Sequence, residues 1–70
     1  ETMVECFVSE YIVNKDQSYI DEKDMLFLWK SYLTHYNKLN VFQKKQDLYD
    51  AVGKYISYDK HYYWNVSSMY

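Results

Sequence analysis

Few side chains in this 70-residue sequence have the chemistry of a catalytic or metal-binding group. The soft and imidazole ligands are Cys6, His35 and His61, which are too scattered to predict a four-ligand zinc site. Glu22 and Asp24 stand close together, but acidic residues at the start of a helix stabilise its positive end and need no acid–base role. The single glycine excludes a glycine-rich phosphate loop. We therefore expect no enzyme activity, no cofactor and no bound metal.

Aromatic rings and lysines are the side chains that could instead bind a partner. The sequence has ten Tyr, three Phe and two Trp, and we expect Tyr55, Tyr63 and Tyr70 to be exposed. Tyrosine is enriched in protein interfaces and also stacks on unpaired bases, so the rings do not choose between these partners. The net charge is −2, but lysines outnumber acidic residues after residue 37. The second half is therefore the more positive end of the chain.

The length predicts one domain, residues 1–70, whose core must be aromatic because one cysteine cannot form an intrachain disulfide. No apolar run is long enough to cross a membrane, and no secretory signal is visible, so we expect no membrane partner. The chain does not begin with Met. We interpret it as a piece of a longer protein.

The elements that must position these side chains centre on a helix predicted over residues 21–36. Its apolar residues recur at the helical spacing and cover more than one side, so the other segments should pack around it. Trp29 should be buried between the first and third helices. Asp21 can cap the start of this helix, and Asn37 can take the left-handed position at its end.

The flanking segments are of two kinds, which differ in the spacing of their apolar residues. Helical spacing predicts helices over residues 2–13 and 41–52, where Thr2 with Glu5 and Asn40 with Gln43 match a capping box. Alternation predicts strands at residues 56–58 and 62–66, joined by a turn at residues 59–61, with residues 18–20 as a third strand. Lys45 projects onto the apolar side of the third helix, so either its stem lies along the core edge or the helix phase is wrong.

The resulting α+β order of helix, strand, helix, helix and β-hairpin is that of a small winged helix. The segments SYIDEKDMLFLWKSYL, NVFQKKQDLYDAV and ISYDKHYYWNV carry this resemblance, which extends from about Phe7 to Val66. The chain resembles the small domains at the C-terminal ends of viral and phage primase-helicases of the poxvirus and giant-virus type. The resemblance implies a non-catalytic module that binds DNA or RNA in a viral replication protein, inside the host cytoplasm or nucleus.

The resemblance also implies which residues make the contact. In a winged helix the start of the third helix enters the major groove and the wing contacts the backbone. Glutamine suits adenine and lysine suits phosphate. Carried onto this sequence, the nucleic-acid-binding residues are Lys38, Gln43, Lys44, Gln46, Lys54, Lys60 and His61.

Two features of the sequence oppose this interpretation. Asp47 and Asp50 lie on the same outward face of the third helix, and the net charge is −2, whereas DNA-binding domains are usually basic. The alternative is a winged helix that contacts protein, either within a larger chain or in an oligomer. In that case the lysines only solvate a helix.

Overall fold

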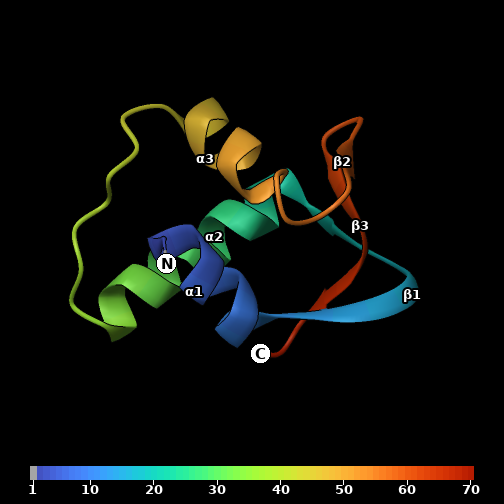
Figure 1. Cartoon of the computed structure of the whole chain (residues 1–70), viewed down its shortest axis with the longest axis horizontal. Helices are drawn as coiled ribbons and strands as arrows, with labels where there is room; N and C mark the ends of the chain where they lie inside the picture. Colours follow the sequence, from blue (N-terminus) through green and yellow to red (C-terminus); the bar gives the residue numbers. More distant parts are fainter. Residues whose placement is uncertain (1) are drawn as a thin grey trace.

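Three helices and a three-stranded antiparallel sheet form one small α+β domain in the computed structural model, which describes residues 2–70 (Figure 1). The elements in chain order are α1 (Met3–Tyr11), β1 (Ile12–Asp21), α2 (Glu22–His35), α3 (Lys45–Val52), β2 (Tyr58–Asp59) and β3 (Tyr62–Ser68). The strand order is β1-β3-β2, so the last strand lies between the other two. No helix in the described part of the chain is long and apolar enough to cross a membrane.

The first helix and the first strand meet earlier in the sequence than predicted. Thr2 caps α1, as predicted, by accepting a hydrogen bond from the Glu5 amide at 3.1 Å. However, α1 ends at Tyr11, and the chain becomes extended at Ile12. The β-branched pair Ile12 and Val13 prefers extended backbone and pairs with the far end of β3. The predicted helix over residues 2–13 was therefore too long, and the predicted strand at residues 18–20 too short.

The prediction that Tyr19 and Ile20 supply the third strand is confirmed. Tyr19 pairs with Trp64, and Ile20 pairs with Tyr63. The β1–β3 register shifts between Asn14 and Tyr19, which makes this stretch irregular. A long edge strand interrupted in this way is protected from pairing with other chains.

Both ends of α2 follow the prediction. Asp21 accepts a hydrogen bond from the Lys23 amide at 2.7 Å, which satisfies one of the free donors at the helix start. At the other end, Asn37 is left-handed with φ 53°. The Lys38 amide then donates back to the Leu33 carbonyl at 2.8 Å, which closes the last turn.

The third helix begins later than predicted, so the predicted range 41–52 was wrong in its first turn. The Asn40 side chain does not cap a helix there. Its Oδ1 accepts from the Phe42 amide at 3.0 Å and from Trp29 Nε1 at 3.2 Å. Asn is well suited to such a local turn, which competes with helix formation. As a result α3 starts at Lys45, after Lys44, which makes no side-chain capping bond.

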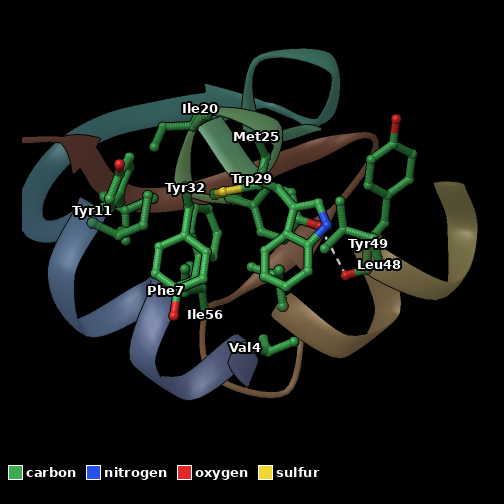
Figure 2. Close-up of a cluster of buried hydrophobic side chains, with 14 of the residues drawn as sticks. Val4, Phe7, Tyr11, Ile20, Met25, Trp29, Tyr32, Leu48, Tyr49 and Ile56 are labelled. Carbon is green, nitrogen blue, oxygen red and sulfur yellow. Dashed lines mark hydrogen bonds between the residues drawn. The ribbon is translucent and has the colours of Figure 1, made fainter. Parts of the chain in front are cut away.

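Trp29 is the centre of the core, as predicted, and has no exposed surface (Figure 2). Its ring meets Phe7 of α1 edge-on at 5.3 Å between centroids and lies 5.7 Å from Phe42. Tyr32, one turn along α2, stacks on it at 5.7 Å. Edge-on and offset ring pairs of this kind add to the stabilisation from burial alone.

Tyr63 was predicted to be exposed, and that prediction was wrong. It has no exposed surface, stacks on Tyr58 at 4.5 Å, and donates a hydrogen bond to the Tyr49 carbonyl at 2.8 Å. Asn65 has a φ of 61°, and this left-handed residue breaks the alternation of β3. Tyr63 and Val66 consequently both face the core, although they are an odd number of residues apart.

Tyr55 and Tyr70 are exposed, as predicted. Tyr55 follows α3, and Tyr70 follows β3 and rests on Tyr11 with 4.8 Å between ring centroids.

Candidate functional site

The structure separates the seven predicted binding residues into different places. Gln43, Lys44 and Gln46 lie at the start of α3, and Lys60 and His61 form the turn between β2 and β3. Lys38 follows the end of α2, and Lys54 follows the end of α3.

The start of α3 borders a small hollow, which we call the α2–α3 hollow. It has a volume of about 150 Å³. Its lining consists of Leu26, Lys30, Asn40, Phe42, Gln43, Lys44, Lys45 and Leu48. Two of the predicted residues, the sequence neighbours Gln43 and Lys44, line it, and the fold brings Lys30 of α2 to them and to Lys45. The lining combines three apolar side chains with three lysines and two amides.

The electrostatics of this hollow are one-sided. Among the described residues no carboxylate lines it. The one ion pair within residues 2–70 joins His61 and Glu22 elsewhere, so none of the three lysines of the hollow is paired. The balancing acids of α3, Asp47 and Asp50, lie outside the lining. A hollow lined by three lysines and by no carboxylate attracts anions.

The turn at Lys60 and His61 has a different character. Both residues are left-handed, with φ 52° and 72°, as expected for a two-residue hairpin turn whose twist matches its strands. The predicted three-residue turn is one residue shorter because Asp59 pairs with Tyr62. The Glu22 amide donates to the His61 carbonyl at 3.0 Å, so the turn is fixed to the start of α2.

Side chains reinforce this attachment. His61 Nδ1 lies 3.1 Å from Glu22 Oε1, and the Tyr58 hydroxyl donates to the same oxygen at 2.7 Å. Burial and the hydrogen bond to Glu22 raise the pKa of Tyr58 to about 12. An interaction with Gln46 lowers this pKa and so opposes part of the rise. His61 and Tyr58 therefore meet at Glu22, whereas the Gln46 side chain donates to Asp50 at 2.9 Å.

The surroundings of the turn are acidic. Asp21, Glu22 and Asp24 lie at the start of α2, where the turn is attached, and Asp59 precedes Lys60 directly. The positive charge of Lys60 is therefore offset locally. The α2–α3 hollow, not the turn, is the more positive part of the predicted interface.

The remaining two predicted residues are apart from this region. Lys38 Nζ lies 5.9 Å from the ring centroid of Tyr32, a cation–π contact at the far end of α2. Lys54 lines a separate hollow of about 250 Å³ with residues from the start of α1, the connection before α3 and the end of α3. Neither lysine lines the α2–α3 hollow.

Exposed apolar side chains mark a second type of surface. Phe27 is 68 % exposed on α2, and Leu39 is 89 % exposed on the connection to α3. Phe27 and Leu28 border a shallow hollow of about 430 Å³, together with Tyr11 and Tyr70. Large exposed apolar side chains that gather in one place are typical of contact surfaces.

Within residues 2–70 no group of three or more His, Cys, Asp or Glu side chains is placed to hold a metal ion. Cys6 is half-buried against the core, the position that the sequence predicts for it. His35 is in the last turn of α2, where a cationic imidazole would suit the helix dipole.

Sequence reasoning missed Lys30, Lys45 and Asn40 as members of the site. The sequence did indicate a conflict at Lys45, because a helix over residues 41–52 would place this charged residue on its apolar side. The later start of α3 resolves this, because Lys45 is exposed. Lys30 gave no signal, since its place beside α3 depends on how the connection folds back over α2.

Comparison with protein-family models, with curated proteins and with solved structures found no match. The geometry of the chain is therefore the basis for assigning its function.

Proposed function

We propose that this domain is a nucleic-acid-binding module of the winged-helix type that contacts phosphates through the start of α3 and the turn of the β-hairpin. The observation that carries the proposal is the set of unpaired lysines at the start of α3, with Gln43 beside them. Lysine binds phosphate as a point charge, and the adjoining amide can bond to a base edge.

The topology supports the winged-helix type. The order α1-β1-α2-α3-β2-β3, with β1 beside β3, places a hairpin next to α2 and α3. The hairpin turn is attached to the start of α2 by the hydrogen bond from the Glu22 amide to the His61 carbonyl. Two features depart from the type: α3 has only 8 residues, and residues 36–44 form a long connection before it.

The size of the basic surface predicts the strength of binding. With few lysines near phosphates and acidic residues at the turn, affinity should be modest and should fall steeply with salt. Each phosphate that a lysine neutralises contributes about 0.7 to 0.9 to the slope of log K against log salt concentration. In a parent replication protein, a weak module of this kind would add to the affinity of other parts by raising their effective concentration.

The test is a fluorescence-anisotropy titration of short duplex DNA, single-stranded DNA and single-stranded RNA, started at low salt and repeated as the salt concentration is raised. Binding at low salt is expected, and Lys44→Ala should reduce the slope by about one. Lys15→Ala is the matched control, because Lys15 lies in the irregular part of β1, away from α3. If none of the three nucleic acids binds at the lowest salt, the proposal is wrong.

A second candidate function is protein contact, which the exposed Phe27 and Leu39 favour. It predicts that replacing the lysines leaves association unchanged and that Phe27→Ser weakens association with another chain. Sedimentation of the domain at increasing concentration, with and without Phe27→Ser, separates this candidate from the first.

A further inference from the structure

The lining of the α2–α3 hollow includes three lysines from two separate segments and three apolar side chains. Lys30 comes from the middle of α2, whereas Lys44 and Lys45 come from the start of α3. Three like charges around one small space repel one another unless an anion lies between them. We propose that the hollow binds the terminal phosphate of a nucleic-acid strand, an inference that rests on the proposed function and names the group that this site selects.

Charge favours a terminal phosphate over an internal one. An internal phosphodiester has a single negative charge, whereas a phosphate monoester has a charge of about −1.5 to −2 at pH 7 and three strong acceptor oxygens. Three unpaired ammonium groups match the monoester better. The match also disfavours a carboxylate, which has one charge and two oxygens.

The lining also has two amide side chains, of which that of Asn40 is held in place by hydrogen bonds. Asn40 Oδ1 accepts from both Trp29 Nε1 and the Phe42 amide, so the NH₂ group of Asn40 remains as its donor. Trp29 is fully buried, so this arrangement is fixed to the core. Gln43 contributes a second amide to the lining.

The size of the hollow suits a phosphate group. A volume of about 150 Å³ corresponds to about five waters at about 30 Å³ each, enough for a phosphate and the carbon that carries it. The lining also includes the apolar side chains of Leu26, Phe42 and Leu48.

The first arm of the test uses inorganic phosphate and acetate as probes of the intact domain, followed by amide chemical shifts. Phosphate is expected to shift the amides of Lys30, Asn40, Lys44 and Lys45 more than acetate does at equal ionic strength. Lys30→Ala is expected to weaken phosphate binding at least threefold. Lys23→Ala, also an exposed lysine of α2 but outside the hollow, is the matched control and should not.

The second arm compares one single-stranded oligonucleotide with a 5′-phosphate, with a 3′-phosphate and with neither. A phosphorylated strand is expected to bind at least fivefold more tightly, and Lys30→Ala should abolish this preference. If strands bind without any preference for a phosphorylated end, the inference fails and the proposed function stands. If inorganic phosphate binds but no strand does, both the proposed function and the strand-end inference fail.

Discussion

Replacing Trp29 by alanine should remove a large part of the stability of the domain. The ring has no exposed surface and contacts Phe7, Tyr32 and Phe42, so its loss leaves a cavity between α1, α2 and the connection to α3. Large-to-small changes of buried Trp or Phe cost about 3–5 kcal/mol. The lost indole hydrogen bond to Asn40 adds about 0.5–1.5 kcal/mol.

This loss is comparable with the whole stability that a domain of this size can have. At about 0.05–0.15 kcal/mol per residue, the free energy of unfolding should be about 3.5–10 kcal/mol. Trp29→Ala is therefore expected to be unfolded, or close to it, at room temperature. The milder change Trp29→Phe keeps a ring in the core and should leave the domain folded but less stable.

The assay is urea unfolding followed by far-ultraviolet circular dichroism, which does not depend on the indole that is removed. Phe27→Ala is the matched control, an aromatic-to-alanine change on the same helix at a side chain that is 68 % exposed. Exposed positions usually change stability by less than about 0.5 kcal/mol. Equal losses for Trp29→Ala and Phe27→Ala would refute the placement of α2 at the centre of the core.

Three further predictions concern the hairpin and its neighbours. Tyr63→Phe removes one buried hydrogen bond and should lower the free energy of unfolding by about 1 kcal/mol, whereas Tyr70→Phe, at a largely exposed ring, should not. The pKa of Tyr58 is raised from 10.0 to about 12 by folding, so its stabilisation is complete below pH 10 and is lost as the pH rises towards 12. Tyr58→Phe should make alkaline unfolding, measured by circular dichroism, less steep over this range. His61→Gly relieves a left-handed residue and should raise the melting temperature, since the contact it removes, between a largely exposed imidazole and Glu22, contributes little.

The sequence was sufficient to predict α2 and the pairing of residues 19–20 with the hairpin. These depend on local signals: the helical spacing around Trp29, the Asp21 cap, and the left-handed Asn37. The pairing followed because a hairpin needs a third strand. Such signals are contained within a few residues.

Two predictions failed because they depended on side-chain contacts between distant segments. Asn40 has the sequence signature of a helix cap, but its side chain bonds to Trp29, 11 residues away. The burial of Tyr63 depends on the left-handed Asn65, whose side chain also accepts a hydrogen bond from the Gln17 amide. Neither contact can be inferred from spacing, because each joins segments whose positions are set by the whole fold.

In the candidate site, too, residues close in the sequence were predicted and a contact between distant segments was not. Lys44 and Gln43 were predicted from the resemblance and line the hollow, but Lys30, which lines it with them, belongs to another helix. The acidic setting of the hairpin turn was also hidden, because the turn reaches the start of α2 through a backbone hydrogen bond to Glu22. Charge counts along the chain could not locate the positive region.

Mapping of amide chemical shifts during a DNA titration tests the proposed function most directly, because it identifies the surface as well as the binding. With short single-stranded and duplex DNA at low salt, the account predicts shifts that concentrate at Lys30, Lys44 and Lys45 and extend to the turn at Lys60, and that vanish as salt is raised. Shifts confined to the Phe27 side of α2, or no shifts at all, would contradict it.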